Sequence, residues 1–228
     1  MKAGWWSALA LVLLLPVPSL GAWLGLSVLP GRPLGRALFF AAKVWLVALP
    51  VIWRLAVERR PPSLSPLRHG GMVRGGLLGL AMAAMVVLAY AVLGPSLLDP
   101  PALQRMGAAT GLSDARVYLV AALYWIGVNS VLEEMVWRWF VVERFESVGL
   151  GRWSVPASAA GFMAHHLVAL RVYCDWPATL LCGAGIFIGG AVWSALYRQT
   201  RSIWPGYLSH AIVDVAVFAI GWHLIRGG

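Results

Sequence analysis

The stretch GLLGLAMAAMVVLAYAVLGPSL, residues 76–97, contains no charged residue and decides the fold of this chain. Its 22 residues, at a helical rise of about 1.5 Å each, are long enough to cross the hydrocarbon core of a bilayer, which is about 30 Å thick. The apolar character is continuous rather than alternating, which favours a helix over a strand of a membrane barrel. The segment is therefore predicted to be a transmembrane helix.

The same pattern recurs along the whole chain. Of its 228 residues, 60% are hydrophobic and only 12% are charged, whereas a soluble domain is about half apolar. Seven spans are predicted, with six or eight still compatible because several boundaries contain Pro or Gly. They are residues 5–29, 37–57, 76–97, 117–142, 155–170, 177–197 and 203–225. The expected fold is an all-α, polytopic transmembrane helical bundle.

The whole chain, residues 1–228, is expected to form a single membrane domain. Within it, residues 1–97 supply N-terminal accessory helices, and residues 117–225 supply the helices that carry the chemistry. The first residues resemble a signal peptide, but the apolar character resumes at once with WLGLSVL, so a first transmembrane helix is preferred. Residues 99–116 are expected to form a short interfacial helix between two spans.

The net charge of +9 is explained by membrane topology. Placing the arginine-rich segment 54–74 in the cytoplasm puts eleven Lys and Arg residues inside and six outside. By the positive-inside rule, this asymmetry predicts a cytoplasmic N-terminus and an external C-terminus. The lipid bilayer is thus an expected partner and nucleic acid is not. Sixteen arginines against two lysines suggest a GC-rich bacterial genome, so the expected location is the bacterial inner (cell) membrane.

Ionisable side chains within the spans gather in three helices. Each such group costs about 2.5–3.5 kcal/mol near a helix centre, so their clustering predicts one polar site where the three helices meet. They are Glu133, Glu134 and Arg138 in the fourth predicted span, His165 and His166 in the fifth, and His210, Asp214 and the more peripheral His223 in the seventh. Lys43 is the remaining charged group placed inside a span.

The two adjacent glutamates are expected to have different roles. Glu134 and Arg138 are four residues apart, and we expect them to form a structural ion pair that fixes the helix. Glu133 is turned by about 100° from Glu134 and has no cation at i±3 or i±4, while Asn129, one turn earlier, can hydrogen-bond its carboxylate. An unpaired carboxylate in apolar surroundings is suited to act as a base near neutral pH. Glu133 is therefore the candidate general base, with a gating or packing role as the alternative.

The other two helices repeat the spacing of four residues, in Phe162 with His166 and in His210 with Asp214. A single histidine in a membrane helix is usually a hydrogen-bonded packing residue, and an interhelical hydrogen-bond pair is the alternative for His210 and Asp214. His166 is assigned to the site because two other unusual polar groups accompany it. His165 points to another side of its helix and is left out.

Two other classes of function compete with a metal-free hydrolase. A metal-dependent hydrolase would use Glu133, His166, His210 and Asp214 as ligands, although the compact H-E-x-x-H arrangement is absent. A non-catalytic immunity factor or scaffold is the third possibility. A serine mechanism is disfavoured, because no histidine is spaced to activate Ser130. We expect no metal and no other cofactor.

Three motifs occur in order: Glu-Glu-x-x-x-Arg at 133–138, Phe-x-x-x-His at 162–166 and His-x-x-x-Asp at 210–214. Together they resemble the CPBP family, also called the Abi family, which includes CAAX prenyl endopeptidases and bacteriocin-processing or immunity-linked membrane proteins. The resemblance covers about residues 100–225. It implies a glutamic-type intramembrane protease whose site lies on a helical bundle.

The resemblance also implies a role for each matching residue. Glu133 would activate a water, His166 would help to hold that water, His210 and Asp214 would stabilise the oxyanion, and Glu134 and Arg138, with Asn129 and Phe162, would support the site. Many members have Asn where this chain has Asp214, and an ionised aspartate would repel an oxyanion. Either Asp214 is protonated and donates a hydrogen bond, or it pairs with His210 and holds that ring as a cationic donor.

The expected reaction is hydrolysis of a peptide bond in a membrane-associated protein or peptide, during processing or sorting of a tail or leader. The family suggests a prenylated C-terminal tail, a bacteriocin leader or a sorting tail as substrate. A site nearer the cytoplasm suits the first two more directly. A bacterial origin makes a prenylated tail the less expected of these.

Overall fold

The computed structural model of the chain describes residues 2–63, 65–67 and 70–227, with only the backbone of Lys2 and Ala3. Arg68 and His69 of the arginine-rich segment lie outside the described residues. The described part is helical and contains no strand, which confirms the all-α prediction. The elements are α1 Lys2–Leu14, α2 Pro16–Ala22, η1 Trp23–Val28, α3 Pro33–Ile52, η2 Trp53–Val57, α4 Met72–Leu97, α5 Pro100–Thr110, α6 Ala115–Leu123, η4 Tyr124–Asn129, α7 Ser130–Glu134, η5 Met135–Val142, α8 Glu143–Ser147, η6 Gly151–Trp153, α9 Ser154–Leu170, α10 Trp176–Thr200 and α11 Trp204–Arg226.

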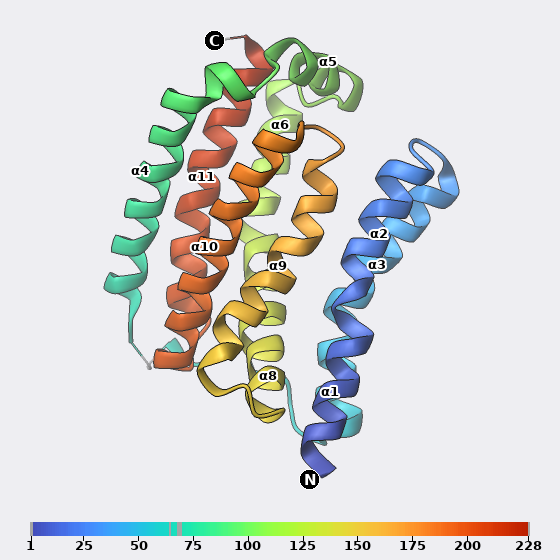
Figure 1. The fold of residues 1–228 in the computed structure, drawn as a ribbon, viewed down its shortest axis with the longest axis vertical. Helices are drawn as coiled ribbons and strands as arrows, with labels where there is room; N and C mark the ends of the chain where they lie inside the picture. Colours follow the sequence, from blue (N-terminus) through green and yellow to red (C-terminus); the bar gives the residue numbers. More distant parts are fainter. Residues whose placement is uncertain (1, 64, 68–69, 228) are drawn as a thin grey trace.

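Within the described residues, six helical segments are long and apolar enough to cross a membrane, and the chain is an integral membrane protein. They are Gly4–Val28, Pro33–Val57, Met72–Leu97, Ala115–Ser147, Trp176–Thr200 and Trp204–Arg226. The remaining predicted span corresponds to α9, whose 17 residues extend for about 26 Å, somewhat short of the hydrocarbon core. The two termini lie at opposite ends of the bundle (Figure 1).

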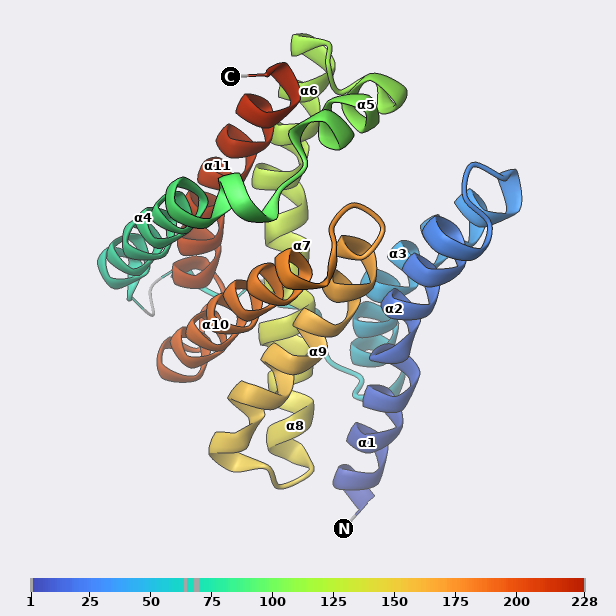
Figure 2. The same ribbon diagram turned by 45° about the horizontal axis from the view of Figure 1, so that its top comes forward.

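The predicted short helix between two spans is present as α5. Asp99 caps it, since its carboxylate accepts a hydrogen bond from the Ala102 N–H at 3.1 Å. Figure 2 shows α5 beside the C-terminal end of α11, against which it packs. The amphipathic helix thus covers the end of the bundle opposite the N-terminus.

The segment Ala115–Ser147 runs through the middle of the bundle, and its η5 part is surrounded by α3, α9 and α10 (Figure 2). Every residue of η5 is buried. Two π-helical stretches, η4 and η5, flank the short α7 that carries the paired glutamates. Such stretches interrupt the regular hydrogen-bond ladder and are frequent at functional sites.

The position of α11 is set by close packing against α4, which lies along it in both views (Figures 1 and 2). The two helices approach at glycines of α4. A Cβ atom on Gly79 would lie 2.8 Å from the Ser209 Cα, and one on Gly75 would collide with the Pro205 carbonyl. Because only glycine permits this approach, the sequence of α4 fixes the helix that carries two of the predicted site residues.

Ion pairs join the helices at the end of the bundle that carries the N-terminus. Glu58 pairs with Arg54 and with Arg144, which ties η2 to α8. Glu146 accepts hydrogen bonds from Arg198 Nε and Arg201 Nη1, each at 2.7 Å. The arginine-rich segment also emerges at this end, where the positive-inside rule places the cytoplasm. The orientation itself stays a prediction.

Candidate functional site

Three helices that are distant in the sequence bring the predicted polar residues together inside the bundle. Glu133 and Glu134 come from α7, His166 from α9, and His210 and Asp214 from α11. The side chain of Glu134 is fully buried, and Glu133 and His210 are only 6% and 5% exposed. Buried ionisable groups persist when they pair or hydrogen-bond with one another, so the contacts within this group determine its chemistry.

The imidazole of His210 lies between the two adjacent glutamates. Its Nδ1 is 3.2 Å from Glu134 Oε1, and its Nε2 is 3.7 Å from Glu133 Oε2. The ring stacks on Trp193, with centroids 3.9 Å apart and an interplanar angle of 17°. The two glutamates therefore face opposite ring nitrogens, and the stacking fixes the plane in which those nitrogens lie.

Glu134 contacts two basic side chains rather than one. The expected ion pair with Arg138 is present, with 3.2 Å between Arg138 Nη2 and Glu134 Oε1, and both side chains are fully buried. The same oxygen also faces His210 Nδ1. The guanidinium of Arg138 lies 4.8 Å from the ring centroid of Phe162 and 5.3 Å from that of Trp193. Cation–π contacts of this kind help to offset the loss of water around a buried arginine.

The backbone of α11 makes room for the second oxygen of this carboxylate. Glu134 Oε2 lies against Gly206, and a Cβ atom at that position would collide with it. Gly206 is in the first turn of α11, where unpaired N–H groups and the helix dipole favour a negative charge. The absence of a side chain at Gly206 thus lets the carboxylate reach the positive end of the helix.

His166 is held by its own helix. Its Nδ1 is 2.8 Å from the carbonyl oxygen of Phe162, one turn earlier, and a carbonyl can only accept. The proton of the neutral ring is therefore on Nδ1, which leaves a lone pair on Nε2. The Phe162 side chain is 2% exposed, and its ring centroid lies 4.5 Å from that of His166. Phe162 thus holds His166 through both its backbone and its ring.

Asp214 contacts a residue to which the sequence analysis assigned no such role. The Ser130 hydroxyl is 2.7 Å from Asp214 Oδ2, nearer than His210 Nε2 at 3.7 Å. The same hydroxyl is 2.9 Å from the Trp125 carbonyl. Ser130 is 84 residues from Asp214 in the sequence, so no helical spacing signals this contact.

His165 lies in the cluster, although the sequence analysis placed it on another side of its helix. Its side chain is buried, stacks on Trp137 at an interplanar angle of 4°, and has its ring centroid 4.1 Å from that of His166. Potential ligand atoms of Glu133, His165 and His166 lie within 4.8 Å of one another. The only signal in the sequence for this contact was that His165 is adjacent to His166. The expectation that His165 points elsewhere was wrong.

The potential metal ligands that the structure gathers overlap only in part with those named from the sequence. The four expected ligands were Glu133, His166, His210 and Asp214, whereas the compact group consists of Glu133, His165 and His166. Carboxylate and imidazole are suitable Zn²⁺ ligands. The His166 Nε2 lone pair is free to bind, because Nδ1 is occupied by the Phe162 carbonyl. These three residues would be the ones to hold a metal here.

A small cavity of about 60 Å³ reaches Glu133 from the side of α3. Asn129 and Glu133 both line it, together with Lys43 and Tyr124. The hydrogen bond expected between Asn129 and Glu133 stays a prediction. The cavity nevertheless places a carboxylate, an amide, a phenol and an ammonium group around one space.

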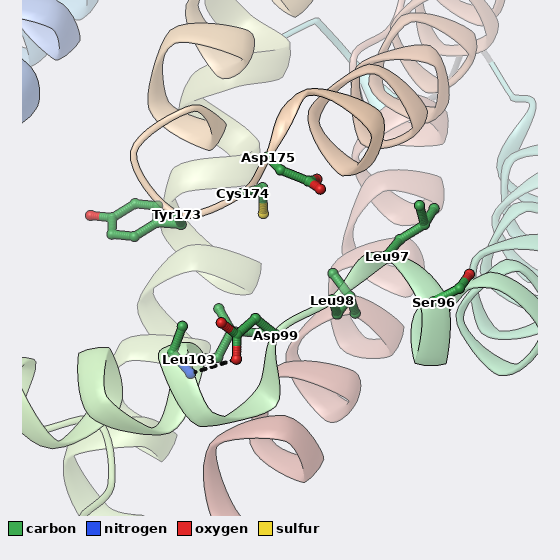
Figure 3. A pocket seen from close by; sticks show the side chains of 9 residues that line it. Ser96, Leu97, Leu98, Asp99, Leu103, Tyr173, Cys174 and Asp175 are labelled. Atoms are coloured by element: carbon green, nitrogen blue, oxygen red, sulfur yellow. Dashed lines mark hydrogen bonds between the residues drawn. The ribbon is translucent and has the colours of Figure 1, made fainter.

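A second cavity, of about 360 Å³, lies between the end of α4 and the turn that joins α9 to α10 (Figure 3). Asp99, Cys174 and Asp175 are among its lining residues. Both aspartates are helix caps, as Asp175 accepts from the Ala178 N–H at 3.0 Å in the way that Asp99 caps α5. No residue predicted for the site lines this cavity.

Comparison with protein families gives one match. Residues 115–216 match the model described as type II CAAX prenyl endopeptidase Rce1-like. The match covers somewhat less than half of the chain, from the start of α6 to within α11, and contains all three motifs. No curated protein and no solved structure shows a significant match to the chain.

Proposed function

Because residues 115–216 belong to the Rce1-like family of type II CAAX prenyl endopeptidases, we propose that this chain is an intramembrane endopeptidase that uses Glu133 to activate water. The family supports a membrane protease as the general function. The assignment of Glu133 rests on the arrangement of the buried polar groups. The observation that carries it is the position of His210 between Glu133 and Glu134.

Glu133 and His166 provide two acceptors for one water molecule. The Glu133 carboxylate accepts hydrogen bonds, and His166 Nε2 carries a lone pair because its Nδ1 donates to the Phe162 carbonyl. A water that donates one proton to each group directs its own lone pair away from both. Such a water is oriented for attack, and Glu133 is proposed to take its proton, because burial favours neutralisation of a carboxylate and disfavours protonation of an imidazole.

The hydrolytic step needs no covalent intermediate with the enzyme. As the water oxygen bonds to the peptide carbonyl carbon, Glu133 takes one water proton, and the carbonyl π electrons move to the oxygen. When this tetrahedral intermediate collapses, the C–N bond breaks and Glu133 returns the proton to the leaving nitrogen. The products are a carboxylic acid and an amine, and Glu133 is again ionised.

His210 is suited to stabilise the oxyanion as an imidazolium. Its Nδ1–H would donate to Glu134, which leaves Nε2–H to donate to the developing negative charge. Glu134 would thereby orient the ring, as a carboxylate orients the histidine of a hydrolytic triad. A preorganised donor at an oxyanion is worth about 10²–10³ in rate. In this proposal Glu134 supports the chemistry as well as the fold.

Asp214 need not carry a charge beside the oxyanion. Ser130 has one hydroxyl proton and lies near two acceptors, the Trp125 carbonyl and Asp214 Oδ2. If Ser130 donates to the carbonyl, it can accept from a protonated Asp214. A neutral Asp214 would then match the asparagine found at this position in many members of the family. We propose this arrangement together with a cationic His210 held mainly by Glu134.

A metal-dependent hydrolase is the second candidate, because Glu133, His165 and His166 form a compact group of potential ligands. A metal held there would act as a Lewis acid and lower the pKa of a bound water. Glu133 would then be a ligand and not the base. The two mechanisms differ in their dependence on His165. The metal alternative uses His165 as a ligand, whereas the metal-free mechanism gives it no role. Its ring packs against those of Trp137, Phe162 and His166.

The substrate is proposed to be a membrane-associated protein or peptide from which a tail or leader is removed. The protein is proposed to lie in a bacterial cell membrane with its N-terminus in the cytoplasm. A prenylated C-terminal tail, a bacteriocin leader and a sorting tail are the candidate substrates. A non-catalytic immunity or scaffold role is the alternative that does not need Glu133.

The experiment that tests the proposal compares protein termini in the native host between wild type and a Glu133→Gln strain at matched expression. The matched control is Glu146→Gln, which changes a carboxylate on the same long helix but away from the site, where it pairs with Arg198 and Arg201. Uncut precursors should accumulate in Glu133→Gln alone, and their junctions would name the substrate. Identical termini in all three strains, with a phenotype in the knockout, would replace the protease with a binding role.

A further inference from the structure

Lys43 is a charged residue near the middle of a membrane helix, outside the segment that matches the protease family. A lysine at this depth is costly, and such residues are rarely retained without a function. Lys43 forms no ion pair within the described part of the chain. Its ammonium group lies instead 4.8 Å from the ring centroid of Trp125 and 5.8 Å from that of Phe39.

The neighbours of Lys43 explain how the lysine is held in this position. Leu46 and Leu49, on the following turns of α3, are buried in the same core as Met135 and Val136 of η5. This packing anchors α3 directly beside the helix that carries Glu133. Lys43 is half-buried and lines the small cavity that also reaches that glutamate.

The size and lining of the cavity indicate what it holds. Its volume of about 60 Å³ corresponds to about two water molecules and is well below the roughly 150 Å³ of a cavity that binds benzene. The polar groups at its wall are Lys43, Tyr124, Asn129 and Glu133, and the remaining lining is apolar. A polar cavity of this size with several hydrogen-bonding groups is expected to be hydrated, whereas an apolar one stays dry.

We propose that this cavity stores the water used in hydrolysis and that Lys43 is a positioning residue, which keeps the cavity hydrated and places a positive charge beside Glu133. This inference rests on the proposed function, in which Glu133 is the base. An ammonium group sharing a small cavity with a carboxylate stabilises its negative charge, while the aromatic faces of Phe39 and Trp125 keep the ammonium in place. The accessory helices thereby complete the site.

The charges around the base are consistent with this role. Arg138 lies with Glu134 on the far side of His210, and so does not face the cavity directly. The groups that face Glu133 are His210 from α11, the histidine pair from α9, and Lys43 from α3. Of these, Lys43 alone is a permanent cation. Its loss would leave Glu133 with histidine protonation and with the charge of Arg138, which is already paired with Glu134, as compensating charges.

The first test measures hydration of the cavity without using activity. The protein is studied in membrane vesicles, with Cys174 and Cys182 replaced by serine. A single cysteine is then placed at Val47, which lines the cavity. The control places it at Val44, which lies on the same helix and is 67% exposed. Thiolates react with aminoethyl and sulfonatoethyl methanethiosulfonate, and thiolates form where water is present. V47C should react at least about tenfold faster than V44C. Equal rates would show a dry cavity and overturn the proposal.

The same assay reports the charge of Lys43. The V47C thiol should react faster with the anionic sulfonatoethyl reagent than with the cationic aminoethyl reagent, because Lys43 attracts anions. Adding Lys43→Met should shift the ratio of these two labelling rates by about tenfold toward the cationic reagent. The matched control is Arg36→Met, which removes a cation from the exposed end of α3 and should leave the ratio unchanged. A ratio that does not respond to Lys43→Met would place the ammonium outside the cavity.

The second test uses cleavage of the substrate that the comparison of termini identifies. Lys43→Met should lower kcat by at least about tenfold with little change in KM, and Lys43→Arg should recover part of the loss. A rise in KM confined to substrates with a carboxylate near the cleavage site would overturn the proposal in favour of substrate binding by Lys43. If the Glu133→Gln variant still cleaves the substrate, Glu133 is not the base and the proposed function is wrong. The role proposed for Lys43 is then also wrong, whatever the labelling rates are.

Discussion

Glu134 Oε1 lies 3.2 Å from His210 Nδ1, and no spacing in the sequence pairs these two residues. Helical spacing pairs His210 with Asp214 instead, but that contact is longer, at 3.7 Å. Glu134 thus joins Arg138 on its own helix to His210 on α11. A residue expected to support the fold is therefore also the nearest anionic partner of the proposed oxyanion donor.

Replacing Glu134 with glutamine should impair cleavage more than replacing Asp214 with asparagine. Glu134→Gln keeps the side-chain volume but removes the charge that holds His210 as an imidazolium, so we expect a loss of about 10²–10³ in kcat. The measurement is kcat per folded molecule, with folding monitored by thermal unfolding, because Arg138 loses its buried partner as well. A larger loss in Asp214→Asn than in Glu134→Gln would contradict this arrangement.

Asp214→Asn is expected to keep activity within about tenfold of wild type. Asparagine is neutral and can both donate to and accept from the Ser130 hydroxyl, which lies 2.7 Å from Asp214 Oδ2. Ser130→Ala combined with Asp214→Asn should show coupling of about 0.5–1.5 kcal/mol in unfolding free energy, the size of one hydrogen bond. A hundredfold fall in activity for Asp214→Asn would instead favour an ionised Asp214 paired with His210.

Gly206→Ala should disturb the site although it adds only a methyl group. The new Cβ would collide with Glu134 Oε2, so we expect about 1–3 kcal/mol of destabilisation together with a loss of cleavage. The matched control is Gly185→Ala in α10, where a Cβ meets no atom within 4 Å. That change should be neutral or stabilising by up to about 1 kcal/mol, because alanine is the better helix former. Comparable thermal unfolding of the two variants would refute the contact.

Removal of metal distinguishes the two hydrolytic mechanisms. With Glu133 as the base, cleavage should be unchanged after treatment with a chelator, and His165→Ala should retain activity within about tenfold. Metal analysis of the purified protein provides the independent measurement. Stoichiometric zinc that is lost in His165→Ala, together with loss of cleavage, would establish the group of Glu133, His165 and His166 as a metal site.

Cys174 offers a test of orientation with a defined pH dependence. Burial raises the pKa of its thiol, the charge of Asp175 raises it further, and Arg171 opposes both effects. Because the thiolate is the reactive form, labelling by an impermeant maleimide should be slower at pH 7 than for a free cysteine and should rise about tenfold per pH unit below the pKa. With Cys182 replaced by serine, right-side-out vesicles should label and inverted ones should not. Labelling only in inverted vesicles would reverse the predicted topology.

Much of the fold follows from local sequence properties. The uncharged run at 76–97 became α4, and the polar stretch at 99–116 contains the short helix α5. These predictions held because length and hydropathy alone decide whether a segment crosses a bilayer. The fifth predicted span corresponds to α9, which at 17 residues is shorter than the six segments that are long enough to cross a membrane.

The sequence indicated that three helices meet at one polar site, but it indicated individual contacts only where both partners lie on one helix. The pair of Glu134 with Arg138 was visible because residues four apart share a helix face. The contact of Ser130 with Asp214 and the inclusion of His165 were not, because they depend on how separate helices are rotated against each other. Such rotation is set by interhelical packing and by the π-helical stretches beside α7, which change the register that a regular helix would have.

The sequence by itself determined that this protein lies in the membrane and that acidic residues and histidines gather in three of its helices, where burying such groups in hydrocarbon is costly. Only the tertiary structure decided which of these groups meet. Glycines at 75 and 79 bring α4 against α11, and the glycine at 206 brings Glu134 to the start of α11 beside His210. Contacts between helices arise from close packing of surfaces, and hydropathy and helical period contain no information about which surfaces those are.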